Sequence, residues 1–390
     1  MNSKANMGKQ PLPTASTLGL FGGGQLGRMF AKAAARLGYH VHVYDPDSES
    51  PAAEVSARHS CAPYEDLDAV RAFAQSVDAV TYEFENVPAQ TVETAARYVP
   101  VRPHASVLSV TRNRLAEKRF LEKQGIPVTP FKPVHSETDL AEALRAFRCP
   151  VVLKTTALGY DGKGQTLVEG PREASAAWAR IGSPDEAIAE KHISFEGECS
   201  MLVARGSTGK LVYFGPFHNR HENHILDLTT WQDGDDSAVA REAREICRAA
   251  AEALELDGMI CMEFFINNGG LLVNEIAPRP HNSGHLTLEA CSISQFEQQV
   301  RLAAGYGPQE PVARAPAAAM VNILGDIWAG GDPDWAAALA DPAVSFHLYG
   351  KSTARPGRKM GHFTVLGTTP EEAAKLALRA RRSLTLRTRP

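Results

Sequence analysis

An apolar strand, a glycine-rich loop and a helix follow one another near the start of the chain, and this order strongly constrains the fold. The loop has Gly22, Gly24 and Gly27 in a G-x-G-x-x-G spacing, and the residues after it predict a helix over 26–37. A second strand ends on Asp45, where a dinucleotide-binding fold has an acid for a ribose. The alternation continues with the strand AVTYEF and predicts an α/β domain with a parallel sheet. It leaves open whether the loop serves NAD or another ligand.

Composition excludes several classes of protein. The chain has 390 residues, enough for two or three domains, and a formal net charge of -4, so no global basic field recruits nucleic acid. Its six cysteines form no C-x-x-C pair, which argues against a zinc site or a disulfide framework and favours a cytoplasmic protein. No run approaches about 18 apolar residues, so we expect no membrane span. Residues 1–16 are polar and predict a flexible tail.

After the first domain, the pattern changes from alternating strands and helices to strands grouped in pairs. CPVVLKTT and EAIAEKHI predict strands on either side of a helix around 172–181, and SMLVAR and LVYFGP predict two more. A long helix is expected at 236–254, before a hairpin with the turn NNGG. The tail predicts strands in AAAMVNIL, FHLYG and HFTVLG and a helix from Pro370.

Two glutamates in the predicted hairpin face each other if the turn is centred on Gly269. Glu263 and Glu275 then project from one face with Cβ atoms roughly 4.5–5.5 Å apart. Two like charges on apolar strands are destabilising, and a divalent cation such as Mg²⁺ relieves the conflict. Asn274 adds an oxygen beside them. The alternative is that a register shift turns one glutamate to solvent.

Lys154 ends an apolar strand, and a glycine-rich loop, GYDGKGQ, follows five residues later. A buried lysine needs an anion, and a nucleotide phosphate is a suitable one. Backbone N–H groups of a glycine loop can close over phosphates, although no Walker A motif is present. A strand-end lysine and a simple turn would explain each feature alone. Together with Glu190 and the glutamate pair they predict a nucleotide site.

The ordered motifs GGGQLGRM, YEFENVP, VLKTTALGYDGKGQ, AEKHISFEGECS, NEIAPRPHNSGH and YGKSTARPGRKMGH resemble the ATP-grasp superfamily. More narrowly, the chain is similar to the ATP-dependent carboxyaminoimidazole ribonucleotide synthases of purine biosynthesis over about residues 17–370. The resemblance implies a Rossmann-like domain at 17–112, an ATP-grasp central lobe at 113–205 and a C-terminal domain at 206–390. It also implies that the first glycine loop faces the acceptor substrate rather than NAD.

The reaction implied by the resemblance uses ATP and Mg²⁺, with bicarbonate as co-substrate. Phosphoryl transfer to bicarbonate would give carboxyphosphate, which carboxylates the exocyclic amine of 5-aminoimidazole ribonucleotide. The expected partners are therefore small molecules, with neither nucleic acid nor membrane, and members of the family are commonly homodimers.

The resemblance also assigns the ATP-binding and metal-binding residues. Arg114 and Lys154 would contact the phosphates of ATP. A loop would cover these phosphates, formed by Gly159, Tyr160, Asp161, Gly162, Lys163, Gly164 and Gln165. The adenine edge would follow Glu190, Lys191, His192 and Ile193, the ribose Glu198, and a further contact would come from His221. Magnesium would be bound by Glu263 and Glu275, with Asn274 beside them.

Catalytic and acceptor residues come from the remaining motifs. Arg279 would hold bicarbonate in a fork, with His281, Asn282 and Lys351 as further catalytic residues. For His281, orienting carboxyphosphate and handling a proton remain alternatives, and the loop could instead be merely stiffened by its prolines. The acceptor would be contacted by Gln25, Leu26, Glu85, Tyr160, Lys163, Lys351 and Arg358. A solvated basic loop is the alternative for the last two.

Three histidines and two departures from the family pattern bear on these assignments. His218, His221 and His224 have a spacing that would align them on a helix, but GPFHNRHENHI is predicted as a loop, so we do not expect zinc there. His224 stands where the family usually has glycine. Lys163 stands where many relatives carry arginine, and lysine lacks the bidentate fork.

Three other functions are alternatives to this ligase activity. A related ATP-grasp ligase, such as a glycinamide ribonucleotide transformylase or a biotin carboxylase, shares the central motifs but not GGGQLGRM or YGKSTARPGRKMGH. An NAD oxidoreductase would leave the Lys154 loop and the glutamate hairpin without a purpose. A non-catalytic nucleotide-binding protein is disfavoured because every expected polar position is filled.

Overall fold

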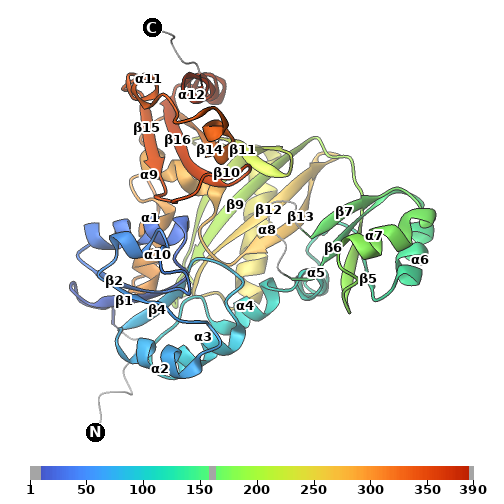
Figure 1. Cartoon of the computed structure of the whole chain (residues 1–390), viewed down its shortest axis with the longest axis horizontal. Coiled ribbons are helices and arrows are strands. Elements are labelled where there is room, and N and C mark those ends of the chain that lie inside the picture. Colours follow the sequence, from blue (N-terminus) through green and yellow to red (C-terminus); the bar gives the residue numbers. More distant parts are fainter. Residues whose placement is uncertain (1–9, 158–163, 386–390) are drawn as a thin grey trace.

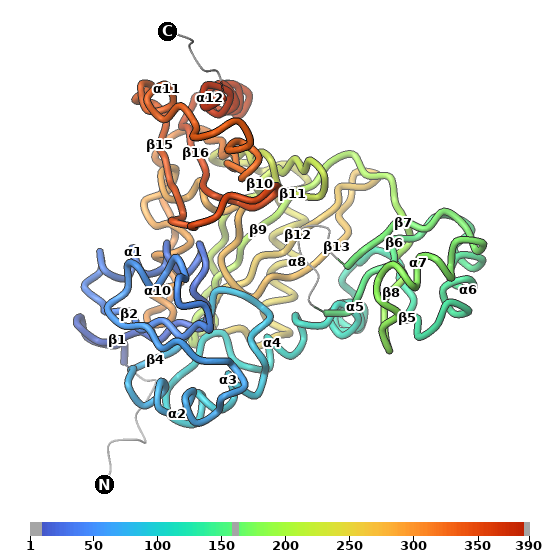
Figure 2. Tube along the Cα trace, in the orientation of Figure 1, coloured from blue at the N-terminus to red at the C-terminus, as the bar shows by residue number. Residues whose placement is uncertain are grey.

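Three β-sheets organise the chain in the computed structural model, which describes residues 10–157 and 164–385 (Figure 1). A parallel sheet forms the N-terminal domain, a small antiparallel sheet forms a lobe that projects to one side, and an eight-stranded sheet lies between them. The tube in Figure 2 shows the N-terminal domain and the C-terminal strands at the left of the view and the lobe at the right.

The N-terminal sheet confirms the predicted α/β arrangement. Its order is β3 (Arg58–Ser60), β2 (His40–Tyr44), β1 (Thr17–Phe21), β4 (Ala79–Tyr82), and all neighbours are parallel. Helix α1 (Gln25–Arg36) begins one residue before the predicted start. The other helices are α2 (Leu67–Gln75), α3 (Ala89–Ala96) and α4 (Ala105–Thr111), with a 3-10 turn, η2, at Ala53–Val55. Apolar strands therefore produce a sheet that is buried on both faces.

The lobe is a four-stranded antiparallel sheet entered through helix α5 (Arg114–Lys123). Asn113 caps this helix by accepting from the N–H groups of residues 115 and 116, and Gly125 follows its end with φ +70°. The strand order is β5 (Phe131–Val134), β8 (Ala187–Lys191), β6 (Val151–Thr155), β7 (Gln165–Val168). Helices α6 (Glu137–Phe147) and α7 (Ala174–Arg180), with η3 (Pro171–Glu173), pack on the sheet.

The large sheet collects strands from two predicted domains. Its order is β13 (Gly270–Ala277), β12 (Gly258–Asn267), β9 (Gly197–Arg205), β10 (Leu211–Glu222), β11 (Ile225–Gln232), β14 (Ala317–Leu324), β16 (Lys359–Gly367), β15 (Val344–Leu348). Strand β9 belongs to this sheet although it lies in the segment predicted as the central lobe. The remaining helices are α8 (Ala238–Ala253), η4 (Asn282–Leu286), α9 (Thr287–Ala290), α10 (Gln295–Ala303), η5 (Gly325–Gly330), α11 (Trp335–Leu339) and α12 (Pro370–Ser383).

The prediction of a loop over GPFHNRHENHI is wrong. Strand β10 continues to Glu222, and a two-residue turn joins it to β11. Asn223 and His224 both have positive φ, 50° and 65°, which is the backbone of a type I′ hairpin turn. His224 thus adopts the left-handed conformation that a glycine takes easily. Side chains from Phe217 onward alternate between the sheet and solvent, a pattern hidden in the sequence by the run of polar residues.

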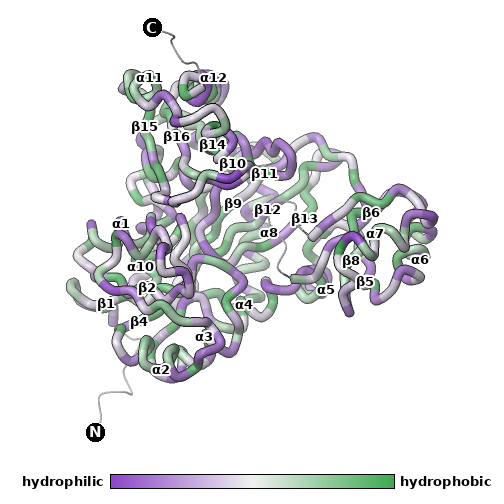
Figure 3. The backbone as a smooth tube through the Cα atoms, in the orientation of Figure 1, coloured by the Kyte–Doolittle hydropathy of each residue, from purple (hydrophilic) through white to green (hydrophobic). Residues whose placement is uncertain are grey.

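Buried apolar surface holds these parts together. Hydrophobic stretches gather around β12 and α8, whereas the outer helices carry long hydrophilic stretches (Figure 3). Phe264 of β12 is 1% exposed and packs in the core that β9, β12 and α8 share. Helix α10 lies against α1, where Arg36 Nη2 is 2.5 Å from Glu297 Oε2. Helix α10 also packs against β12, so it links the N-terminal domain to the large sheet.

Within residues 10–157 and 164–385, none of the helices has the length and apolar character needed to cross a bilayer. All six cysteines carry free thiols. Four of them, Cys199, Cys247, Cys261 and Cys291, are buried, and burial raises the pKa of each thiol.

His42, on β2, should make stability depend on pH. Its ring is buried between the hydroxyls of Ser76 (3.0 Å) and Ser60 (2.8 Å), and burial, aided by Arg58, lowers its pKa to about 4. Because an unfolded histidine has a pKa near 6.5, this contribution is present above about pH 6.5 and is lost as the pH falls through 4. Urea unfolding should show that wild type loses about 2 kcal/mol more than His42→Gln between pH 7 and pH 5. Equal losses in the two proteins would contradict this prediction.

Candidate active site

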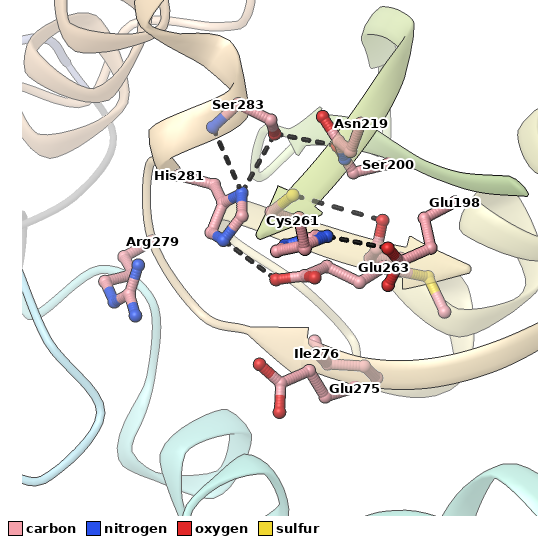
Figure 4. Close-up of polar contacts among 12 residues, drawn as sticks. Glu198, Ser200, Asn219, Cys261, Glu263, Glu275, Ile276, Arg279, His281 and Ser283 are labelled. Atoms are coloured by element: carbon pink, nitrogen blue, oxygen red, sulfur yellow. Dashed lines mark hydrogen bonds and ion pairs between the residues drawn. The ribbon is translucent and has the colours of Figure 1, made fainter. Parts of the chain in front are cut away.

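The two hairpin glutamates lie opposite each other, as predicted, although the turn pairs Asn267 with Gly270 and is not centred on Gly269. Strands β12 and β13 pair Glu263 with Glu275, and the register shifts between Glu263 and Phe264, so Asn274 is an extra residue in β13 (Figure 4). The side-chain oxygen of Asn274 is buried with no hydrogen-bond partner among the described residues. Two carboxylates and an unpartnered amide oxygen are a donor set that fits a hard divalent cation.

Each glutamate of the pair contacts a cationic or hydrogen-bonding group from another element. Arg114 Nη1 of α5 is 2.5 Å from Glu275 Oε2, and His281 Nε2 is 2.8 Å from Glu263 Oε1. Burial raises the pKa of Glu275, but the charge and hydrogen bond of Arg114 outweigh it and lower that pKa to about 2. Glu275 is therefore ionised throughout the physiological range.

Lys154 and Glu190 lie together on neighbouring strands of the lobe. Lys154 Nζ donates to Glu190 Oε2 at 2.9 Å, and Lys118 Nζ lies 3.9 Å from the same oxygen. Burial raises the pKa of Glu190, but the two ammonium groups outweigh it, so the pKa is lowered. The other oxygen, Oε1, is buried without a partner among the described residues. Such an acceptor fits a ligand donor such as an exocyclic amine.

Sequence reasoning missed two charged residues on α5. Lys118 is 1% exposed and donates to the carbonyl of Val273 at 2.9 Å. Glu117 accepts from the N–H of Ile276 at 3.0 Å, and burial together with the charge of Glu275 raises its pKa to about 8. Their positions, three and four residues after Arg114, place all three on one helix face. This spacing is the sequence signal that could have identified Glu117 and Lys118.

Glu198, the predicted ribose residue, and His221, the further predicted nucleotide contact, lie together. Glu198 Oε2 and His221 Nδ1 are 2.8 Å apart on adjacent strands β9 and β10. Burial lowers the pKa of His221, but the hydrogen bond and charge of Glu198 outweigh it and raise the pKa above its usual value. His218 instead lies 3.8 Å from Asp235, and the part of the chain that the structure describes has no group of three or more acidic, histidine or cysteine side chains arranged for a metal.

The other predicted nucleotide residues lie along the edge of the lobe. Lys191 ends β8, and the N–H groups of Lys191 and His192 donate to the carbonyls of Pro130 and Pro150. Ile193 follows and is half-buried. Gln165 pairs with Lys154, and the carbonyl of Gly164 accepts from Thr155. The predicted contacts of Gly159, Tyr160, Asp161, Gly162 and Lys163 lie outside the described residues.

The loop after β13 runs from the glutamate pair to the N-terminal domain. Arg279 Nε donates to Glu85 Oε2 at 2.6 Å. Burial raises the pKa of Glu85, but the Arg279 guanidinium outweighs it, so the pKa is lowered. Asn282 is 6% exposed, and both polar atoms of its side chain lack a partner among the described residues. An unpartnered buried amide here fits a polar ligand rather than a purely structural loop.

The first glycine loop binds carboxylates of its own domain. The N–H groups of Gly24 and Gly27 donate to Glu83 at 2.6 and 2.8 Å, and that of Gly23 donates to Asp45 at 2.7 Å. A Cβ at Gly22 would lie 2.4 Å from a carbon of Glu83, so glycine permits the close approach of this side chain. The backbone N–H groups that would bind the pyrophosphate of a dinucleotide thus already donate to these carboxylates, which disfavours NAD binding at this loop. Sequence reasoning did not select Glu83.

A cleft of about 240 Å³ joins the first glycine loop to the C-terminal basic loop. Its lining includes Gly23, Gly24, Asp45, Asp47, Ser50, Pro51, Glu83, Phe84, Lys351 and Arg358. Lys351 Nζ donates to Gln25 Oε1 at 2.5 Å, and Arg358 Nη1 donates to the carbonyl of Thr353 at 2.7 Å. Leu26 packs beside the cluster of Met29, Phe296 and Tyr349. The structure therefore brings together the two loops that were expected to share a substrate.

Family models match three consecutive parts of the chain. A ribonucleotide synthetase preATP-grasp domain matches residues 15–112, an ATP-grasp domain 119–296, and a phosphoribosylaminoimidazole carboxylase C-terminal domain 318–376.

Curated relatives include N5-carboxyaminoimidazole ribonucleotide synthases from Brucella melitensis and Pseudomonas aeruginosa. They are 40% and 39% identical, over 92% and 89% of this chain and 98% and 94% of theirs. The chain spans only 37% of another relative, a bifunctional purine synthesis protein from Dictyostelium discoideum that is 38% identical over 90% of this chain.

Solved structures with a similar fold indicate the same family. The ADP complex of N5-carboxyaminoimidazole synthetase from Staphylococcus aureus has a TM-score of 0.89 at 33% identity, covering 95% of this chain and 98% of that one. The Aspergillus clavatus N5-carboxyaminoimidazole synthase in complex with ADP and 5-aminoimidazole ribonucleotide has a TM-score of 0.84 at 30% identity, covering 95% and 99%. With these relatives and the motifs in place, the chain belongs to the N5-carboxyaminoimidazole ribonucleotide synthase family of ATP-dependent ATP-grasp ligases.

Proposed function

We propose that this chain uses ATP and bicarbonate to carboxylate the exocyclic amine of 5-aminoimidazole ribonucleotide, giving 5-(carboxyamino)imidazole ribonucleotide, ADP and phosphate. One observation carries the proposal. The Arg279–Glu85 ion pair, 2.6 Å long, links the loop that leaves the glutamate pair to the N-terminal domain that forms the acceptor cleft. The ATP site and the acceptor cleft would thus lie on either side of Arg279.

The ATP half of the site is built from three elements. Lys154 and Arg114 neutralise phosphate charge, and Glu190 accepts from the adenine amine through its unpartnered Oε1. Glu198 holds the ribose, and His221, which is hydrogen-bonded to Glu198, is a further nucleotide contact. Lys118, buried beside Glu190, adds positive charge to the same region. Such fixed groups need little reorganisation when ATP binds.

Magnesium is proposed to bind Glu263 and Glu275, with Asn274 beside them. When bound, it would neutralise phosphate charge during phosphoryl transfer. Arg114 and His281 already lie against the two carboxylates, so the pair is held in place by neighbouring groups.

The acceptor half is proposed to bind the ribonucleotide in the 240 Å³ cleft. Lys351 and Arg358 hold its phosphate, whereas Gln25, Leu26 and Glu85 contact the rest of the molecule. Tyr160 and Lys163 are proposed to complete this half.

The chemistry proceeds in two steps in this proposal. A bicarbonate oxygen attacks the γ-phosphorus of ATP, ADP leaves, and carboxyphosphate forms beside Arg279 and Lys351. The amine nitrogen of the acceptor then bonds to the carboxyl carbon, phosphate leaves with the electron pair of the broken C–O bond, and the amine loses a proton. Arg279, His281 and Asn282 hold the anion and exclude water. A homodimer is also proposed, because members of the family commonly form one.

The central experiment measures ADP release with ATP, Mg²⁺ and bicarbonate. Adding 5-aminoimidazole ribonucleotide should stimulate release strongly, because the acceptor cleft is completed by Lys351 and Arg358. Glycinamide ribonucleotide and biotin should not. Stimulation by either of those compounds alone would identify a different ATP-grasp ligase, and stimulation by none would refute the acceptor assignment.

Substitutions in the basic loop should separate acceptor binding from ATP binding. In Lys351→Ala or Arg358→Ala, the KM for the ribonucleotide should rise about 10- to 100-fold, since each removes a charged hydrogen bond to phosphate. The KM for ATP should stay within about twofold. Lys375→Ala, on the exposed face of α12, is the matched control. An unchanged KM for the ribonucleotide would mean that the loop is only a solvated surface.

Glu263→Gln should raise the Mg²⁺ concentration needed for half-maximal activity by at least about tenfold, because it replaces a charged oxygen ligand with a neutral one. Titrating ADP release with Mg²⁺ measures this change. Glu245→Gln, an exposed residue of α8 paired with Arg248, should behave as wild type. Identical Mg²⁺ dependence in Glu263→Gln and wild type would remove Glu263 from the metal site.

A further inference from the structure

A row of polar side chains crosses one face of the large sheet and ends at His281. Its members are Thr229, Asn219, Ser200 and Ser283. Ser200 of β9 is paired directly with Glu263 of β12, and Asn219 of β10 is paired with Thr229 of β11. Ser283, in η4, covers this row (Figure 4). The row is unusual because the strands around it are apolar, and Ser200, Thr229 and Ser283 are each 0% exposed.

Hydrogen bonds join every member of the row. Thr229 Oγ1 donates to Asn219 Oδ1 at 3.0 Å, and Asn219 Nδ2 donates to Ser200 Oγ at 2.9 Å. Ser200 Oγ and Ser283 Oγ are 2.7 Å apart, and Ser283 Oγ is 2.9 Å from His281 Nδ1. His281 Nε2 then lies 2.8 Å from Glu263 Oε1. Buried hydroxyls in such a chain polarise one another.

The groups around the His281 ring indicate where its hydrogen lies. Ser200 accepts from Asn219, which leaves its own hydrogen available to Ser283 and the hydrogen of Ser283 available to His281 Nδ1. The backbone N–H of Ser283 also points to Nδ1, at 3.3 Å. Nδ1 is therefore an acceptor, and the ring hydrogen lies on Nε2, from which it is donated to the Glu263 carboxylate.

The backbone of His281 is fixed as well. Gln295, 0% exposed, accepts from the N–H of His281 at 2.9 Å and donates to its carbonyl at 2.8 Å. A Cβ at Gly284 would lie 2.4 Å from Gln295 Oε1, so glycine at 284 permits this approach. Backbone and ring are thus both held, which leaves the Nε2 edge as the part of the ring directed to the glutamate pair.

We propose that Ser283, Ser200, Asn219 and Thr229 are positioning residues that keep the hydrogen of His281 on Nε2, so that His281 is a hydrogen-bond donor, to Glu263 in this structure and to an anion of the reaction when one is bound. This inference rests on the proposed function for the identity of the anion, which is bicarbonate or carboxyphosphate. It chooses between the two roles that the sequence left open: His281 orients the anion, and Nε2 does not take up a proton from the acceptor.

Nitrogen NMR on the full-length protein tests the hydrogen position without any activity. Histidine labelled with ¹⁵N gives long-range ¹H–¹⁵N correlations that distinguish a protonated ring nitrogen from an unprotonated one, and the signals of His281 are those lost in His281→Gln. We expect an unprotonated Nδ1 and a protonated Nε2. A protonated Nδ1, with or without a hydrogen on Nε2, overturns the proposal whether or not the chain carboxylates the ribonucleotide.

Kinetics then test whether the row acts through His281. Ser283→Ala and Ser200→Ala should each lower kcat for ribonucleotide-stimulated ADP release about tenfold, the effect of losing one buried hydrogen bond. Their KM for ATP should stay near wild type, and Ser200→Thr, which keeps the hydroxyl, should recover most of kcat. The control is Ser383→Ala, whose hydroxyl donates to Ala380 in α12.

Three kinetic outcomes would overturn the positioning role. They are an unchanged kcat in both alanine variants, a loss that appears only in the KM for ATP, and a Ser200→Thr variant as impaired as Ser200→Ala. If an alanine variant fails to fold, Ser283→Cys and Ser200→Cys provide the same comparison with a weaker donor of similar size. Absence of stimulation in the wild-type protein would refute the proposed function alone and leave the NMR test standing.

Discussion

The opposition of Glu263 and Glu275 is the constraint on which the rest of the site depends. Two carboxylates on paired strands repel each other, and the structure relieves that repulsion with groups from two other elements. Arg114 reaches Glu275 from the helix that enters the lobe, and His281 reaches Glu263 from the loop after β13. The repulsion between the two carboxylates is therefore reduced by contacts from two other parts of the chain, which surround the pair.

Much of this arrangement could be predicted because it is local. The strands of the N-terminal domain follow from short apolar runs, and the NNGG turn predicts the hairpin. Counting residues from the turn, which pairs Asn267 with Gly270, would place Glu263 opposite Asn274, and only the extra residue in β13 brings Glu275 opposite Glu263. The error over β10 had a local cause too. A polar run after a proline resembles a loop, and only pairing with β9 and β11 shows that its outward side chains belong to a strand.

Other features depend on contacts between distant segments and could not be predicted in the same way. Glu83, which directly follows β4, binds the glycine loop across 59 positions of sequence, and Lys118 becomes a buried charge only because Glu190 and the carbonyl of Val273 surround it. Ser200, Asn219 and Thr229 are ordinary strand residues until the sheet places them in one row. In each case the residue type was visible, but its partner was chosen by the tertiary fold.

The acceptor cleft has a consequence for the order in which the molecule is completed. The contact between Lys351 and Gln25 spans 326 positions of sequence, whereas the described residues of the nucleotide half all lie before residue 283. Domains of a growing chain generally fold in the order of synthesis. The residues of the proposed nucleotide half are thus synthesised before Lys351 and Arg358 of the acceptor cleft. The cleft is completed last, when the segment that carries Lys351 packs beside the first helix.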